Sequence, residues 1–346
     1  MKDRIKKIDE SLRFSRMNLK VVLVGAALIL LYPLIFNGNF QMNLGILVLM
    51  WACLGCSWNI FGGYTGQVSL GQAMFFAMGA YGVVLPFYYW GVTPWIGILI
   101  GIVCAVLLAL LVSVPIFKLS AQYFSIATLA LGETVRILLV NLPFTRGMQG
   151  IDFLNFKLNP LYSLQFRDKE PYYYMLAIVL LATFCLMVYI NNSKLGYYFR
   201  TIKANPVSAE SIGINARKYK TLALILSAVI ASVCGSIYVQ YQLYVDPMTV
   251  AASALSTKMI IMAVIGGLGT VYGPIIGAII LVPLSEYVRA SISGAVPGID
   301  LIIYGVLIIV MILYQPNGLA AILHNVRAKR AKNKANTMTP GAGREE

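Results

Sequence analysis

Long apolar stretches broken only by glycine, proline and short polar segments constrain this chain most. Several are long enough to supply the roughly 20 residues that a membrane-spanning helix needs. Only 12% of the 346 residues are charged and 59% are apolar, whereas an average soluble domain is about a quarter charged. Alternating segments of about ten residues, typical of membrane barrels, are not evident. The sequence therefore predicts an all-α polytopic integral membrane protein.

Hydropathy and helix breakers predict about ten spans. They lie near residues 20–36, 42–61, 67–86, 94–117, 122–142, 172–191, 221–243, 257–270, 274–292 and 299–315. An even number of spans places both termini on the same side of the membrane. The eighth and ninth spans are open to a second interpretation, since the glycines and proline between them are also typical of one broken or re-entrant helix.

Basic residues gather in three segments beside predicted spans, and the formal net charge is +14. We expect residues 1–20 to form an amphipathic basic segment, 21–316 the transmembrane domain, and 317–346 a basic, disordered tail. The positive-inside rule places both termini and the basic loop at 192–220 in the cytoplasm. The connection at 143–171 is then external. No basic stretch is interleaved with stacking aromatic residues, which argues against nucleic-acid binding.

A short helix is predicted inside the 192–220 loop. Asn205 is a good N-cap residue, Pro206 suits the first helical position, and Gly213 suits a left-handed residue after the last turn. The remaining candidate residues of this helix are Ser208, Ala209 and Glu210. Basic residues flank it on both sides, so we interpret it as a docking surface for another protein.

A glycine-rich stretch opens the predicted third span, and it places polar side chains where a membrane disfavours them. Its candidate residues are Gly66, Gln67, Ser69, Gly71 and Gln72. Their amide and hydroxyl groups would suit a solute path by offering hydrogen bonds. Close helix packing, with the polar groups bonded across an interface, explains the same pattern equally well.

Glu133 and Arg136 lie in the predicted fifth span with a spacing that allows an ion pair along one helix face. Charges inside a membrane usually face the bundle interior or a water-filled cavity. The pair would suit a zwitterionic solute, but a lock between neighbouring helices is the favoured interpretation.

Gly269, Gly273 and Gly277 recur at intervals of four residues. This spacing predicts small residues on one helical face, and helix packing is the favoured interpretation because no polar side chain accompanies them.

The sequence offers no catalytic residues and no metal site. Cys53 and Cys56 form a C-x-x-C motif inside a predicted span, and the single histidine, His324, lies in the tail. No phosphate-binding G-x-x-x-x-G-K-[ST] loop occurs in the chain. We therefore expect no cofactor on this chain and no enzyme activity of its own.

Five segments, in order, resemble the permease subunits of branched-chain amino acid ABC importers of the high-affinity leucine, isoleucine and valine type. They are GYTGQVSLG at 63–71, TLALGETVR at 128–136, SAESIGIN at 208–215 with Tyr219 and Lys220, GGLGT at 266–270 with Gly273 and Pro274, and QPNGL at 315–319. The resemblance covers most of residues 40–318.

The resemblance implies a multi-pass protein of a bacterial-type cytoplasmic (inner) membrane and a division of labour among subunits. Two permeases, related or identical, would form the path. Two cytoplasmic ATPase subunits would bind ATP and Mg²⁺, and an extracytoplasmic solute-binding protein would deliver solute. The helix at 205–213 would then be the coupling helix. Alternatives are a related ABC permease for urea or short amides and, less favoured, a stand-alone secondary transporter. A secondary transporter would need a coupling-ion site, and such proteins tend to show broken helices in matching halves and carboxylates inside the membrane.

Overall fold

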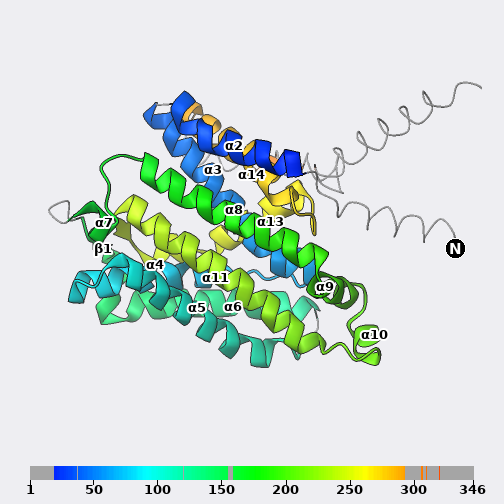
Figure 1. Ribbon diagram of the computed structural model, residues 1–346. Coiled ribbons are helices and arrows are strands. Elements are labelled where there is room, and N and C mark those ends of the chain that lie inside the picture. Colours follow the sequence, from blue (N-terminus) through cyan, green and yellow to red (C-terminus); the bar gives the residue numbers. More distant parts are fainter. Residues whose placement is uncertain are drawn as a thin grey trace, which may run out of the picture.

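The computed structural model describes residues 19–36, 38–119, 121–154 and 159–292, together with residues 305, 306, 309 and 319. Within these ranges the chain is almost entirely helical (Figure 1). The long helices are α2 (Leu19–Ile35), α3 (Asn39–Trp58), α4 (Ala73–Trp90), α5 (Pro94–Ile116), α6 (Ala121–Asn141), α8 (Glu170–Asn192), α11 (Ala216–Gln242), α13 (Ser253–Gly266) and α14 (Gly273–Ile292). The all-α polytopic prediction is confirmed.

Among the described residues, eight helical segments are long and apolar enough to cross a membrane. They correspond to the second through ninth predicted spans, and α2, with 17 residues, corresponds to the first. The tenth predicted span, the N-terminal basic segment and the C-terminal tail lie outside the described residues. The eighth and ninth spans are two separate helices, α13 and α14, joined by a tight turn.

One predicted boundary was wrong, the start of the third span. The second predicted span, 42–61, lies within the helical segment Asn39–Gly63, which ends in a π-helical turn, η1 (Asn59–Gly63). The third span begins only at Ala73, because residues 66–72 form an irregular coil rather than the start of a helix. Gly66 has a φ of 75°, a left-handed conformation that ends helical geometry and that glycine adopts without strain.

The spacing predicted that Gly269 shares a helical face with Gly273 and Gly277, and this prediction was wrong. It lies in the turn before α14 with a φ of 76°, in the left-handed region. Gly273 and Gly277 are in α14, where a Cβ at Gly277 would collide with the carbonyl of Met262. Close packing of α13 against α14 therefore involves these two glycines together with Gly266 of α13, where a Cβ would collide with the Gly273 carbonyl.

The core is built around α3, which contacts α8, α11, α13 and α14. Trp58, Phe61 and Leu54 are among its fully buried side chains. A second tight crossing joins α4 to α11, where a Cβ at Gly79 or Gly235 would collide with the facing backbone. Helix backbones come this close only where side chains are absent.

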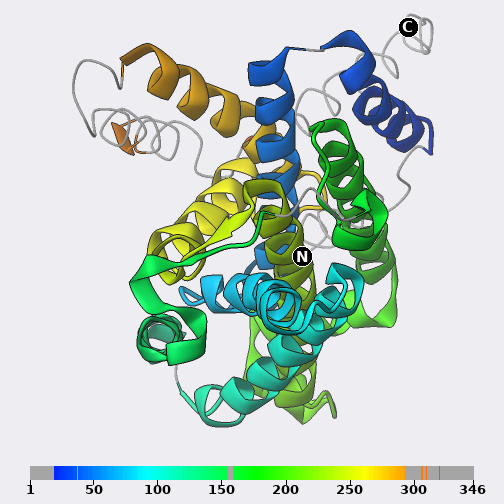
Figure 2. The same ribbon diagram turned by 90° about the vertical axis from the view of Figure 1, so that its left-hand side faces the viewer.

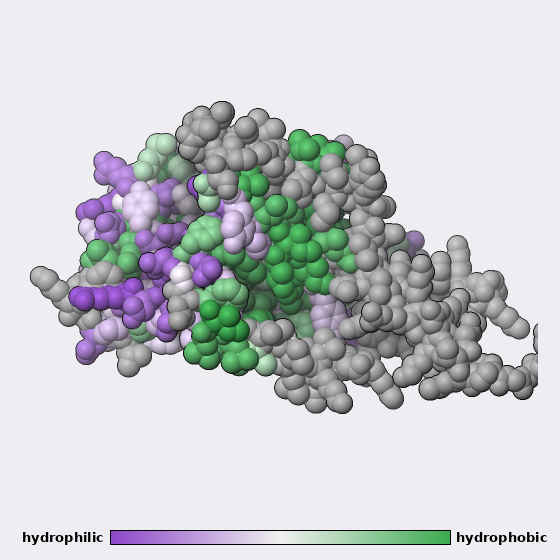
Figure 3. Space-filling model, turned by 90° about the horizontal axis from the view of Figure 1, so that it is seen from above, coloured by the Kyte–Doolittle hydropathy of each residue, from purple (hydrophilic) through white to green (hydrophobic). Residues whose placement is uncertain are grey.

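Short elements cover the two ends of the bundle. At one end, β1 (Ile151–Asp152) pairs antiparallel with β2 (Tyr244–Val245), near the single-turn helices η2 (Pro143–Thr145), η3 (Gly147–Gln149), α7 (Pro160–Ser163) and α12 (Pro247–Val250). At the opposite end lie α9 (Lys194–Ala204) and α10 (Pro206–Ser211) (Figure 1). Figure 3 shows hydrophilic side chains gathered at the β1 end and a hydrophobic surface beside them, as a membrane-embedded bundle requires.

Candidate functional site

The coil at 66–72 lies against the inner face of α6. The Leu70 N–H donates to Thr128 Oγ1 at 3.1 Å, and Ser125 Oγ donates to the Val68 carbonyl at 2.7 Å. Gly71 touches the α6 backbone so closely that a Cβ there would collide with the Thr128 carbonyl. The structure thus brings together two parts of the predicted path, the glycine-rich stretch and α6.

The polar side chains of this coil have different surroundings. Gln67 is half-buried, whereas Ser69 and Gln72 are fully buried. Gln72 Nε2 donates to Ser227 Oγ on α11, and Ser227 Oγ is in turn within 2.7 Å of the Ser57 carbonyl on α3. Gln72 therefore joins helices, which matches the packing interpretation of this residue. Among the candidate path residues of the stretch, Gly66 is exposed and Gln67 half-buried, and Val68, between Gln67 and Ser69, is exposed as well.

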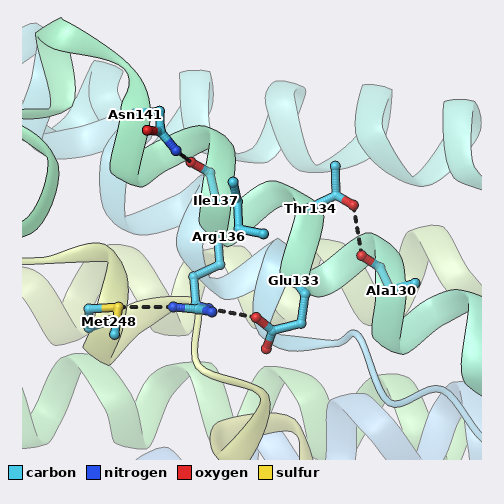
Figure 4. A network of polar contacts seen from close by, with 7 residues as sticks. All are labelled: Ala130, Glu133, Thr134, Arg136, Ile137, Asn141 and Met248. Atoms are coloured by element: carbon cyan, nitrogen blue, oxygen red, sulfur yellow. Dashed lines mark hydrogen bonds and ion pairs between the residues drawn. The ribbon is translucent and has the colours of Figure 1, made fainter.

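Glu133 and Arg136 form an ion pair near the middle of α6, with 2.7 Å between Glu133 Oε2 and Arg136 Nε. The side chains are 31% and 26% exposed, respectively. Arg136 Nη1 also lies 2.9 Å from the Met248 sulfur of α12, so the guanidinium bridges two elements (Figure 4). Gly132, directly before Glu133, is the residue on which Gly71 packs, with its Cβ position 3.1 Å from Gly71 Cα.

The predicted docking helix is present as α10. Asn205 Oδ1 accepts hydrogen bonds from the N–H groups of Val207 at 2.9 Å and Ser208 at 3.3 Å. Pro206 occupies the first turn, and Gly213 has a φ of 84° after the last. An Asn cap with these bonds stabilises a short helix by about 1 kcal/mol.

One face of α10 is held by the chain and the other is open. Ala209 is fully buried with Ile202, Ile214 and Ala216 in a small apolar cluster. Val207 and Ile212 are 72% and 62% exposed, and Ser208 and Glu210 are exposed as well. Large aliphatic side chains on a free helical face are typical of a surface that binds another protein.

No group of three or more His, Cys, Asp or Glu side chains capable of holding a metal ion occurs in the described part of the chain.

Residues 23–312 match the family described as the branched-chain amino acid transport system permease component. The chain belongs to this family. It is 27% identical over 306 residues to LivM, the high-affinity branched-chain amino acid transport system permease protein of Escherichia coli, covering 80% of this chain and 69% of the relative. LivM of Salmonella typhimurium is 26% identical over 309 residues, covering 81% and 69%. LivH of Salmonella typhimurium is 27% identical over 142 residues, which is 41% of this chain and 44% of that relative.

Sequence reasoning missed a polar network at the α9–α10 end of this permease. Asn59 in η1 accepts from the Gly269 N–H and donates to the Thr270 carbonyl, both at 2.8 Å. Lys203 Nζ donates to the Gly63 carbonyl at 2.7 Å. The one available signal was a single asparagine inside an apolar run, which a membrane tolerates only with partners.

Lys203 is an exposed residue whose charged group makes a partly buried contact. The residue as a whole is exposed, while the hydrogen bond from its ammonium group to Gly63 is partly buried. Desolvation by the neighbouring protein lowers the pKa of Lys203 below its ordinary value. The sequence identified this residue only as one of the basic residues before α10.

Proposed function

We propose that this permease is one of two that form the path of an ATP-driven importer of branched-chain amino acids. The proposal depends on the family match over residues 23–312. Similarity to both LivM and LivH, each a permease protein of a high-affinity branched-chain system, supports a related second permease as the partner. The cytoplasmic (inner) membrane of a bacterial-type cell is the proposed location.

The α6 face that carries Glu133 and Arg136 is the proposed place of the path. Both side chains are partly exposed near the middle of a spanning helix. Exposing a charge to lipid costs at least about 2.5 kcal/mol, so this face requires water or another protein beside it. A path shared with a second permease supplies both. A pair of opposite charges also complements the ammonium and carboxylate of an amino acid.

The open face of α10 is the proposed docking surface for a cytoplasmic ATPase. Its cap residues fix the helix, Ala209 anchors it, and Val207 and Ile212 are available to a partner. Under this proposal both termini and the 192–220 loop face the cytoplasm, while the 143–171 connection lies outside beneath a solute-binding protein. ATP and Mg²⁺ are bound by the ATPase subunits, and this chain hydrolyses nothing.

The first experiment is purification from the native membrane in mild detergent, followed by reconstitution of what copurifies. We expect two ATPase subunits and a second permease, and ATP-dependent uptake of labelled leucine into proteoliposomes once the binding protein is added. Labelled urea and acetamide are tested in parallel, and their preferred uptake would favour the amide permease. A chain that purifies alone and moves solute without ATP would contradict the proposal.

A second experiment tests the docking surface. Replacing Glu210 with Lys on the exposed side of α10 is expected to weaken ATPase association and lower uptake by about tenfold, which corresponds to about 1.4 kcal/mol. Insertion should remain unchanged and thermal stability nearly so, because the Glu210 side chain is exposed, makes no hydrogen bond among the described residues, and interacts with Lys220 only through a surface charge attraction worth at most about 1 kcal/mol. Ala209→Leu and Gly213→Val are expected to have the same effect by displacing the helix. Unchanged uptake in all three variants would remove the docking assignment.

A further inference from the structure

Lys203 connects the segment that carries α10 to the end of the most enclosed helix of the chain. Its Nζ donates to the carbonyl of Gly63, the last residue of η1, at 2.7 Å. Its stem passes Gly66, where a Cβ would lie 3.0 Å from Lys203 Cγ. A Cβ on Gly269 would lie 3.3 Å from Nζ. The side chain therefore meets three backbone segments at one point.

The partner of Lys203 is a backbone carbonyl and not an acid. Glu133–Arg136 is the only ion pair among the described residues, so Lys203 does not pair with a described carboxylate. The carbonyls at the C-terminal end of a helix lack intrahelical partners and carry partial negative charge, which an ammonium stabilises. Although Lys203 is an exposed residue, its ammonium bonds to the Gly63 carbonyl.

Lys203 is linked closely to α10, both along the chain and through packing. Only Ala204 and Asn205 separate Lys203 from the start of α10, and Asn205 caps that helix through two hydrogen bonds. On the other side, Ile202 is buried in the same apolar cluster as Ala209. A displacement of α10 by a bound partner therefore reaches Lys203 with little chain in between to absorb it.

From Gly63 the contacts continue into the α13–α14 turn. Asn59 binds the Gly269 N–H and the Thr270 carbonyl. Thr270 Oγ1 in turn donates to the Gly267 carbonyl and accepts from the Gly273 N–H at the start of α14. The π-helical turn that holds Asn59 is a geometry found frequently at functional sites.

The contacts also continue towards α6. The chain leaves η1 at Gly63 and becomes the coil at 66–72, which packs on α6 through Gly71 and Gly132. Glu133 is the next residue along α6. A shift of the Gly63 end of α3 therefore moves the coil that lies beside the charged pair.

We propose that Lys203 is a positioning residue that transmits movement of α10 to the π-helical end of α3, and from there to the coil beside Glu133 and to the α13–α14 turn. This inference rests on the proposed function, since it takes α10 as the surface moved by an ATPase.

The test uses the assembled importer in proteoliposomes, with ATP hydrolysis and leucine uptake measured in the same vesicles. The variants are Lys203→Met, Lys203→Gln and Lys203→Arg, with Lys218→Met as the matched control for loss of one positive charge. Lys218 is exposed, and its side chain makes no hydrogen bond among the described residues. The readout is leucine transported per ATP hydrolysed, together with the amount of ATPase that copurifies.

We expect Lys203→Met to lower transport per ATP by about tenfold, which corresponds to about 1.4 kcal/mol, with the ATPases still bound. Lys203→Gln retains a hydrogen-bond donor without the charge, so its transport per ATP should fall less. Lys203→Arg should keep most of the wild-type transport per ATP, and Lys218→Met should match the wild type. A purely structural role would instead reduce the amount of complex and leave the ratio unchanged.

An unchanged ratio in Lys203→Met overturns the inference. If that variant does not assemble, the Gln variant decides, and a wild-type ratio there overturns the inference as well. The proposed function fails separately, when wild-type vesicles show no ATP-dependent leucine uptake. In that case the defect appears before any variant is compared.

Discussion

α3 and α6 are both membrane-spanning helices with polar residues, but their surroundings are opposite. The α3 segment is 78% buried inside the chain and the α6 segment only 28%. Asn59, at the end of α3, finds both of its hydrogen-bond partners in the same chain. Glu133 and Arg136 on α6 are partly open at the chain surface, and Figure 2 shows α6 at one side of the bundle. Residues of the same chain surround α3, whereas the open face of α6 is available for contact with another molecule.

The largest expected effect is at the enclosed end of α3. A Cβ on Gly63 would collide with the Asn59 amide and lie 2.8 Å from the Gly269 nitrogen. Gly63→Ala should therefore cost about 3 kcal/mol, through overpacking and the lost hydrogen bonds of Asn59. The melting temperature of the purified chain in detergent measures this effect.

Gly25→Ala in α2 is the matched control, because among the described residues no atom beyond its own stretch of helix lies within 4 Å of a Cβ built there. We expect that variant to stay within about 0.5 kcal/mol of the wild type. Equal melting temperatures for the two alanine variants would mean that the end of α3 is less tightly enclosed than the contacts indicate.

An intermediate effect is expected on α6. Glu133→Gln leaves Arg136 without a charged partner inside the membrane and should destabilise the chain by about 2 kcal/mol. The double variant Glu133→Gln with Arg136→Met should recover most of that stability and still lose leucine uptake. Stability is measured by thermal melting, and uptake in proteoliposomes.

Restored uptake in the double variant would show that the pair only locks helices together. α6 would then resemble α3, with polar residues that serve the packing of the chain.

The smallest expected loss of stability comes from a comparison of the buried and exposed faces of α6. Thr128 is 2% exposed and its Oγ1 accepts the Leu70 N–H. Thr128→Val should cost about 1 kcal/mol because that N–H loses its partner. Thr134 is exposed and bonds only the Ala130 carbonyl of its own helix, so Thr134→Val should remain within about 0.5 kcal/mol. A larger loss for Thr134→Val would reveal packing on the outer face of α6.

The sequence predicted the helices well, because an apolar run long enough to span a membrane has few other ways to satisfy its backbone. The short helix α10 was predicted for a local reason, since Asn205, Pro206 and Gly213 each suit one helical position. Local sequence patterns did not predict the coil at 66–72. Val68 and Leu70 are as apolar as helical residues, and the glycines of this stretch are equally common in tightly packed membrane helices, so the left-handed conformation of Gly66 was not evident from the sequence.

The polar network at the end of α3 was not predictable from local pattern. Asn59 bonds residues 210 and 211 positions later in the chain, and no spacing rule connects residues so far apart. Lys203 was indistinguishable from other basic residues near α10. Gly269 was assigned to a helix face because its spacing fits one, whereas its positive φ places it in a turn.

The distance in sequence between α3 and its partners has a consequence for biogenesis. Ser57 bonds Ser227, 170 residues later, and Asn59 bonds Thr270, 211 residues later. At about 5–20 residues per second, the ribosome needs roughly 10–40 s to synthesise that interval. Throughout this time α3 has left the ribosome and its polar side chains still lack their final partners. The polar contacts of Ser57 and Asn59 can therefore form only after α11 and the α13–α14 turn have been synthesised, so this part of the fold is completed late.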